Sequence, residues 1–105
     1  MDHMIFWISY DFLDGKMKLA SLTSAQIRAA RALVRWRAQD LAQASSVGVA
    51  TIRRAELAGV ETSMTAANDL AVRRALEAAG VEFIDENGGG PGVRLRKPPK
   101  ERPHK

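Results

Sequence analysis

The sequence contains no cysteine and only two histidines. Without cysteine the chain can form no disulfide, no thiolate zinc site and no cysteine nucleophile. His3 and His104 stand at opposite ends of the chain, so the sequence offers no histidine metal cluster and no catalytic triad. Asp85 and Glu86 fall in an expected loop, where a solvated turn explains them better than acid–base chemistry does. We therefore expect no catalytic residues, no metal site and no cofactor.

Long apolar runs are also missing. Residues 5–13 are rich in apolar and aromatic side chains, but a bilayer span needs about 20 apolar residues. The stretch has no basic region before it and no small-residue cleavage site after it, so we expect neither a secretory signal nor a membrane partner, and a cytoplasmic protein. Two interpretations of residues 1–20 stay open: a strand or arm that covers a hydrophobic surface, or a start-site artefact, since Met17 is an alternative beginning.

Basic residues outnumber acidic ones, and in the middle of the chain they are all arginine. The 105 residues suffice for one small domain, and 16 Lys+Arg against 12 Asp+Glu give a formal charge of +4. The sequence pI is ≈ 10.0, which is common among nucleic-acid-binding proteins. Between residues 24 and 80 all eight basic residues are arginine. Arginine can grip a phosphate or a guanine edge with two parallel hydrogen bonds, although a GC-rich genome would produce the same bias.

Apolar spacing predicts a helical domain over residues 21–80, with helices at about 24–35, 38–45, 49–57 and 65–79. Thr23 or Ser24 can cap the first helix, and Gly80 ends the last one. In the first helix we expect a buried stripe, with a neighbouring arginine stripe that is partly exposed. The buried stripe consists of Ile27, Ala30, Leu33 and Val34, and the arginine stripe of Arg28, Arg31 and Arg35.

Residues 41–56 form the most informative segment, because a very short turn separates two short helices. Leu41, Val47 and Ile52 are spaced so that they can meet beneath the turn. This is the arrangement of a helix-turn-helix, in which the second helix is pushed outward into the major groove of DNA. That second helix carries Arg53 and Arg54 and little acid.

After residue 80 the spacing of apolar residues changes from the helical pattern to the alternation typical of strands. Residues 81–84 and 93–96 alternate as strands do, so we predict a β-hairpin over 81–96 that packs on the preceding helix or joins a second subunit. The glycine-rich turn between them lacks the following helix and the Lys-Ser/Thr pair of a phosphate loop, so we expect no nucleotide site there. Residues 97–105 are rich in Pro and Lys and are expected to form a disordered basic tail.

A family resemblance follows from particular residues between 27 and 76. They are Ala30 to Leu33, Trp36, Asp40 to Ala42, Val47, Thr51, Ile52 and Arg54 to Glu56. In this pattern the chain resembles the Xre family of helix-turn-helix regulators, which includes the phage Cro and repressor DNA-binding domains. The ending, from Ala75 to Ile84 and Asn87 to Gly90, is similar to that of many short bacterial members.

The resemblance implies a mainly α, lambda-repressor-like domain of four to five helices, here followed by the hairpin. It implies a buried ion pair between Arg31 and Glu56, with residues 49–57 as the recognition helix. It also implies a transcriptional regulator, a repressor in many members, that binds double-stranded DNA as a homodimer. The hairpin is one candidate for the dimer contact.

Several positions depart from the family pattern. Arg37 and Ala38 stand where Ser or Thr and then Gln are usual, Ser46 replaces the turn glycine, and Gly48 replaces the Ser or Thr cap. Val49 and Ala50 stand where polar base-contacting side chains are usual, so we expect backbone contacts to dominate. The expected DNA-contacting residues are Arg37, Gly48, Val49, Ala50, Thr51, Arg53, Arg54, Thr62 and Ser63. The alternative hypothesis is an antitoxin-like or other protein-interaction module with a toxin-like partner.

Overall fold

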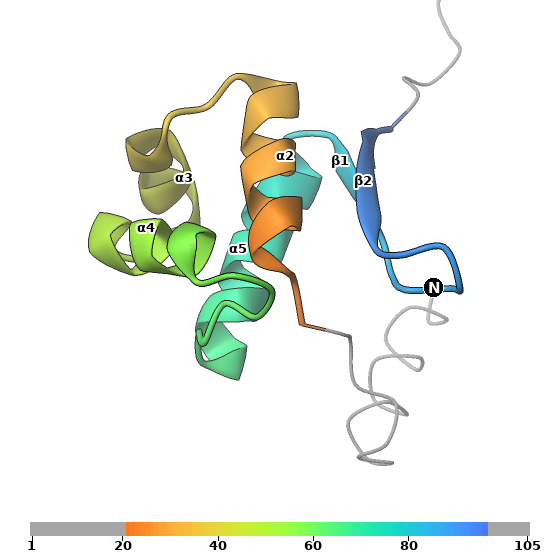
Figure 1. Cartoon of the computed structure of the whole chain (residues 1–105). Helices are drawn as coiled ribbons and strands as arrows, with labels where there is room; N and C mark the ends of the chain where they lie inside the picture. Colours follow the sequence, from red (N-terminus) through yellow and green to blue (C-terminus); the bar gives the residue numbers. More distant parts are fainter. Residues whose placement is uncertain (1–20, 97–105) are drawn as a thin grey trace, which may run out of the picture.

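The computed structural model describes residues 21–96. These contain four helices, α2 (Ser24–Val34), α3 (Ala38–Ser45), α4 (Val49–Leu57) and α5 (Ala66–Ala78), followed by the strands β1 (Val81–Ile84) and β2 (Gly92–Leu95) (Figure 1). The mainly helical class with a C-terminal hairpin is confirmed. The expected N-terminal extension (1–20) and basic tail (97–105) lie outside the described residues. None of the helices in the described part is long and apolar enough to cross a bilayer.

Local signals in the sequence explain where the helices begin and end. The Thr23 hydroxyl accepts a hydrogen bond from the Gln26 backbone N–H (3.1 Å), and the Gln26 side chain accepts one from the Thr23 N–H (2.9 Å). This reciprocal cap satisfies two N–H groups that the helix itself leaves unpaired. Thr65 caps α5 through one bond, in which its hydroxyl accepts from the Asn68 N–H (3.1 Å). The predicted bounds of all four helices are confirmed to within a residue at each end.

The hydrophobic core lies where the four helices and the hairpin meet. Its fully buried large side chains include Leu22, Ile27, Leu41, Ile52, Val72, Leu76 and Val81. Val47, in the turn between α3 and α4, is also buried, so the predicted meeting of Leu41, Val47 and Ile52 is confirmed. Leu33 is a correction, because it is 37% exposed and does not belong to the buried stripe of α2.

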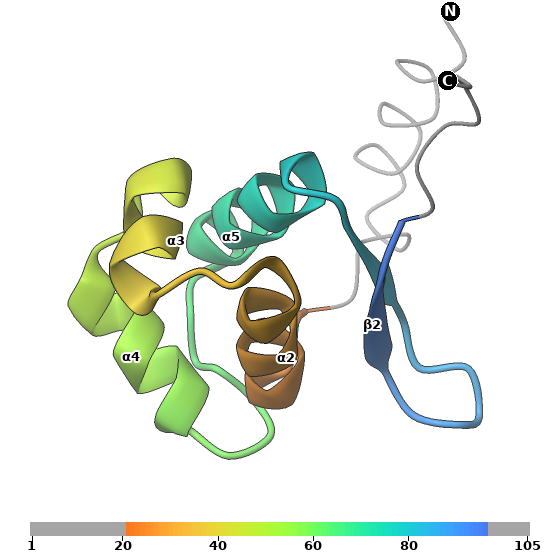
Figure 2. The same ribbon diagram turned by 90° about the horizontal axis from the view of Figure 1, so that it is seen from above.

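The hairpin packs against the outer side of α2, next to the end of α5 (Figure 2). Val81 pairs with Leu95 and Phe83 with Val93, in the predicted antiparallel register. Gln26 fastens the turn end of the hairpin to α2, since its side-chain amide donates to the carbonyls of Ile84 (3.3 Å) and Gly92 (3.0 Å). The hairpin is thus part of the same packed body as the helices.

Candidate nucleic-acid interface

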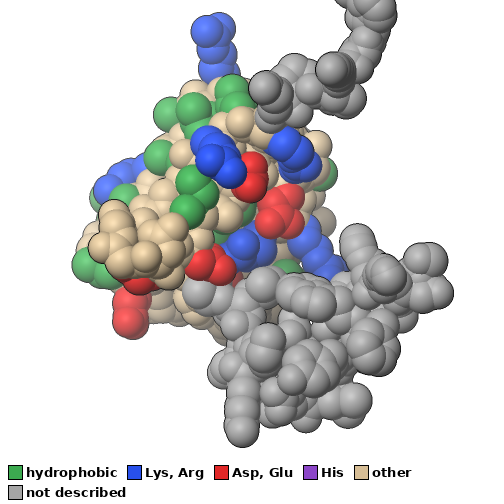
Figure 3. Space-filling view, turned by 90° about the vertical axis from the view of Figure 1, so that its right-hand side faces the viewer, with side chains coloured by type: hydrophobic (Ala, Val, Ile, Leu, Met, Phe, Trp, Pro, Cys, Tyr) green, Lys and Arg blue, Asp and Glu red, His purple; other side chains and the backbone are tan. Residues whose placement is uncertain are grey.

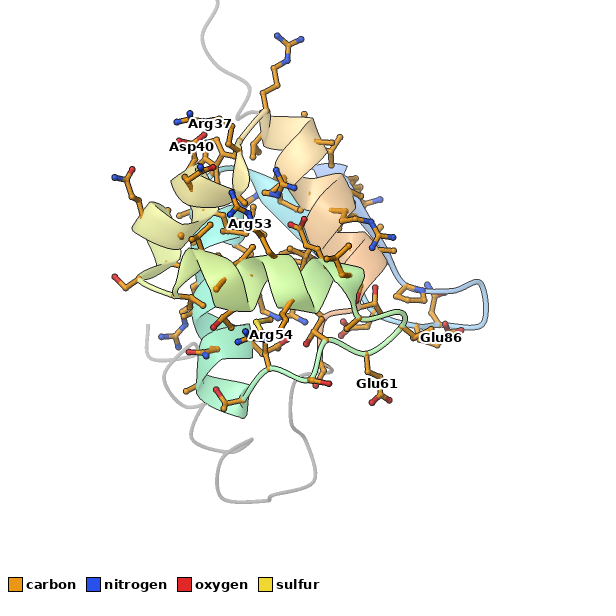
Figure 4. The ribbon with its side chains drawn as sticks, turned by 60° about the vertical axis from the view of Figure 1, so that its left-hand side comes forward. Arg37, Asp40, Arg53, Arg54, Glu61 and Glu86 are labelled. Atoms are coloured by element: carbon orange, nitrogen blue, oxygen red, sulfur yellow. The ribbon has the colours of Figure 1, made fainter. Side chains whose placement is uncertain are left out.

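Helix α4 lies on the surface with one side buried. Ile52, Ala55 and Glu56 face the interior, whereas Arg53 and Arg54 are exposed. Because successive helical residues are about 100° apart, the two arginines leave the helix in different directions. In Figure 4, Arg53 lies on the edge of α4 nearer Arg37, and Arg54 lies on the opposite edge. Together they flank the outward surface of the helix.

Side chains of α2 hold the C-terminal end of α4. The last carbonyls of a helix have no partner within the helix. Here the buried Ser24 hydroxyl donates to the Ala55 carbonyl (2.6 Å), and the Arg28 guanidinium donates to the Glu56 carbonyl. Neither contact was predicted from the sequence. The spacing of residues 24, 28 and 31 along one side of a helix was the available signal.

Arg31 and Glu56 form the ion pair that the family resemblance implied. Arg31 Nε donates to Glu56 Oε2 (2.7 Å), and Arg31 Nη2 donates to Glu56 Oε1 (2.8 Å). The third donor, Nη1, bonds the carbonyl of Trp36 (2.8 Å). The hydrogen bond to Glu56 raises the pKa of Arg31 above its ordinary value, against the opposing effect of burial. One side chain therefore fixes both α4 and the connection that follows α2.

The outward side of α4 carries positive charge only. Its single acid, Glu56, is 7% exposed and paired with Arg31. Arg54 Nη2 donates weakly to the Thr51 hydroxyl (3.4 Å), and Arg53 has no hydrogen bond or ion pair to another residue of the described range 21–96. Both guanidinium groups are therefore available to an anionic ligand.

The first residues of α4 are small or apolar. Gly48 precedes the helix and supplies no side-chain cap, and a Cβ built there comes no closer than 4.0 Å to the Thr51 hydroxyl. Ala50 is exposed, whereas Val49 is half-buried and packs against the core. Only part of the Val49 side chain is therefore open to the DNA contact predicted for it.

Arg37, expected to bind phosphate, is exposed but already has a partner. Its guanidinium donates to Asp40 from Nε (3.3 Å) and Nη2 (3.2 Å), and its backbone N–H donates to Asp40 Oδ2 (2.8 Å). These hydrogen bonds lower the pKa of Asp40, the side-chain bonds more than the backbone bond. Any phosphate bound by Arg37 would lie beside an ionised carboxylate, which weakens the contact.

In the loop after α4, Thr62 does not lie as expected for a DNA contact. Thr62 is only 7% exposed, and its hydroxyl accepts a hydrogen bond from the Met64 N–H (3.2 Å), so its side chain does not point outward to a phosphate. Ser63 is exposed with a φ of 64°, but the neighbouring Glu61 adds an exposed carboxylate. The loop thus contains no basic side chain and one acid, which is unfavourable for binding a nucleic-acid backbone.

The glycine-rich turn of the hairpin binds its own carboxylate. Glu86 Oε2 accepts hydrogen bonds from the backbone N–H groups of Gly88 (2.9 Å) and Gly90 (3.2 Å), and Asn87 Oδ1 accepts one from Gly89 (3.2 Å). The N–H groups that a phosphate would need are therefore engaged.

The hairpin side of the molecule differs from the outward side of α4. Arg94 pairs with Glu82 across the strands (Nε–Oε1 3.1 Å), and Arg73 of α5 is buried between Glu77 and Asp85 with its guanidinium over the ring of Phe83. Figure 3 shows acidic and basic side chains next to each other on this side. Within residues 21–96 no three potential metal ligands lie together.

Comparison with known proteins adds no identification. No protein-family model matches the chain, and no curated protein matches it significantly. The resemblance to Xre regulators therefore rests on the residues named above.

Proposed function

We propose that the chain is a lambda-repressor-like, sequence-specific DNA-binding transcriptional regulator whose helix α4 enters the major groove. The observation that carries this proposal is the outward side of α4, which presents Arg53 and Arg54 without any acid. A ligand with closely spaced negative charges fits this surface, and guanine edges in the major groove accept two hydrogen bonds from an arginine. The anchoring of α4 by α2 supports the proposal, because a rigid helix loses little entropy on binding.

In the proposed complex, the residues on and around α4 make different contacts with the DNA. Arg53 and Arg54 bind guanine or phosphate, and Ala50 contacts thymine methyl groups. Gly48 lets the DNA backbone approach the unpaired N–H groups at the start of the helix. Arg37 contributes less because it is paired with Asp40. Ser63 also contributes less, because its loop carries the exposed acid Glu61 and no basic side chain, and Thr62 makes no contact. Direct base contacts are thus few, and phosphate contacts dominate the affinity.

A salt titration of binding to random-sequence duplex DNA tests the proposal. Each phosphate contact contributes about −0.9 to the slope of log affinity against log salt. We expect Arg53→Ala to weaken binding and to reduce the slope by about 0.9 if Arg53 binds a phosphate. Arg94→Ala is the matched control, because it removes one positive charge from the hairpin side. No binding at about 50 mM salt, where phosphate contacts are strong, would refute the proposal and favour the alternative of a protein-interaction module.

A further inference from the structure

The turn of the hairpin contains the only asparagine–glycine step in the chain, Asn87–Gly88. The side-chain amide carbon of an asparagine can be attacked by the backbone nitrogen of the next residue, because the product is an unstrained five-membered succinimide ring. Glycine at the second position favours the attack, since it has no Cβ to crowd the forming ring. The DNA contacts proposed above use neither residue.

Two hydrogen bonds place the groups that this reaction needs. Glu86 Oε2 accepts from the Gly88 N–H (2.9 Å), so a base lies on the nitrogen that would attack. The Gly89 N–H donates to Asn87 Oδ1 (3.2 Å), so a donor lies on the oxygen that would become negatively charged. The sequence marks the asparagine–glycine step, but only the folded turn brings the base and the donor to it.

The turn is exposed, and its conformation is held by several contacts. Residues 85–89 are exposed, and Figure 4 shows Glu86 on a turn that extends beyond the helices, so water reaches the site. Glu86 also accepts from the Gly90 N–H (3.2 Å), and Gly88 has a φ of 102°, with no atom within 4 Å of the position of a Cβ. Gln26 holds the strand ends on both sides of the turn. The reacting groups are therefore positioned before the reaction begins, which is a large source of rate in intramolecular reactions.

We propose that this turn is a self-modification site, at which Asn87 converts slowly to aspartate and isoaspartate. In the first step Gly88 N forms a bond to Asn87 Cγ, and the proton of Gly88 N passes to the Glu86 carboxylate. The π electrons of the Cγ–Oδ1 bond move to Oδ1, where the Gly89 N–H stabilises the charge. The carbonyl then re-forms as the Cγ–Nδ2 bond breaks, and the nitrogen takes the proton back from Glu86 and leaves as ammonia.

Water completes the reaction by opening the succinimide ring. Its attack on the side-chain carbonyl gives aspartate, and its attack on the main-chain carbonyl of Asn87 gives isoaspartate, in which the backbone runs through the former side chain. Each product places a new carboxylate beside Glu86, and isoaspartate also lengthens the backbone of the turn by one carbon. The reaction consumes only water, requires no DNA and occurs once in each chain, so it is not enzymatic turnover.

Peptide mass spectrometry of the full chain, incubated at neutral pH and then digested with trypsin, tests the site. Asn68 is an internal control, because it is the other asparagine of the chain and is followed by aspartate instead of glycine. The N–H of that aspartate, Asp69, bonds the Thr65 carbonyl within α5 (2.9 Å) and is not free to attack. We expect Asn87 to lose its amide about 10-fold faster than Asn68, or more. Hydroxylamine, which cleaves succinimides, should cut the chain after residue 87.

Glu86→Gln keeps the size of the side chain but removes the base. We expect it to slow the loss of the Asn87 amide by about 10-fold, less than the roughly 100-fold of a well-matched base, because a carboxylate is a weak base for an amide nitrogen. Glu82→Gln on β1 makes the same charge change in the hairpin and should leave the rate unchanged; circular dichroism checks that both variants fold. Unfolding the wild type in guanidinium chloride should also slow the reaction, because the base and the donor then leave Asn87. Equal rates at Asn87 and Asn68, a rate that Glu86→Gln leaves unchanged or raises, or a rate that unfolding does not lower would each overturn the proposal.

Discussion

Replacing Arg31 with methionine tests whether its ion pair with Glu56 holds α4 in place. Methionine keeps much of the length and apolar surface of the arginine stem but removes all its donors. The Glu56 side chain is 9% exposed and would lose both guanidinium hydrogen bonds, at 2.7 and 2.8 Å. The Trp36 carbonyl would lose a third. Breaking a buried pair in this way costs about 3–5 kcal/mol, because the remaining charge is left without compensation.

The size of the loss in the free energy of unfolding shows whether the pair behaves as an exposed or as a buried ion pair. An exposed ion pair contributes only about 0–1 kcal/mol, whereas a desolvated one costs several times more to break. The Arg31 side chain is 23% exposed, so solvent reaches part of it. We therefore expect a loss near the lower end, about 3 kcal/mol, for Arg31→Met and a similar loss for Glu56→Leu. The double variant should lose much less than the sum, because neither charge is then stranded.

Urea denaturation followed by far-ultraviolet circular dichroism gives the four free energies of the double-mutant cycle. An unchanged dependence on urea concentration would show that only the stability has changed. A loss below about 1 kcal/mol in both single variants would mean that the pair behaves like a surface contact. The positioning of α4 would then have to come from Ser24, Arg28 and the buried side chains of Ile52 and Ala55.

Three further variants test other contacts. Gln26→Ala should lower the free energy of unfolding by about 1–3 kcal/mol in urea titrations, because two strand carbonyls lose their donor and the Thr23 N–H loses its acceptor; a change below about 0.5 kcal/mol, the usual surface effect, would show that Gln26 does not hold the hairpin to α2. Burial raises the pKa of Asp69 in the folded chain, so its contribution to stability is full below about pH 4 and is lost as the pH rises through the raised pKa. Asp69→Asn should therefore be more stable than wild type at neutral pH, and this advantage should disappear on acidification; equal effects at both pH values would contradict it. Gly48→Asp should stabilise α4 by a few tenths of a kcal/mol through capping yet weaken DNA binding, whereas Gly48→Ser should only stabilise; equal DNA affinities of the two variants would argue against phosphate near Gly48.

Local chemistry explains why so much of the fold could be predicted. The Thr23 cap, the glycine after α5 and the period-two strands each act over a few residues, so the chain itself marks the boundaries. The partners of Leu41 and Val47 were predictable for the same reason, because a three-residue turn leaves two short helices few ways to pack.

The remaining features depend on contacts between distant residues. A local capping pattern marks Gln26, but its bonds to the hairpin could not be predicted, because its partners Ile84 and Gly92 lie 58 and 66 residues away. Thr62 is polar and follows a helix, yet the return of the chain to α5 buries it. The arginines of α2 had the right spacing, but only the position of α4 decides that Arg28 and Arg31 both bond Glu56. The Arg37–Asp40 pair is the exception, since its three-residue separation was visible in the sequence.

Binding of Arg53→Ala and Arg54→Ala to DNA selected from a random pool tests the role of α4 most directly. If Arg54 contacts a base, Arg54→Ala should lose about 1–3 kcal/mol of affinity for the selected sequence and relax the preference at one position. If it contacts only phosphate, the loss should be the same for every sequence. Arg94→Ala, on the hairpin side, should bind like wild type in either case. Unchanged affinity in both α4 variants would contradict the placement of this helix in the major groove.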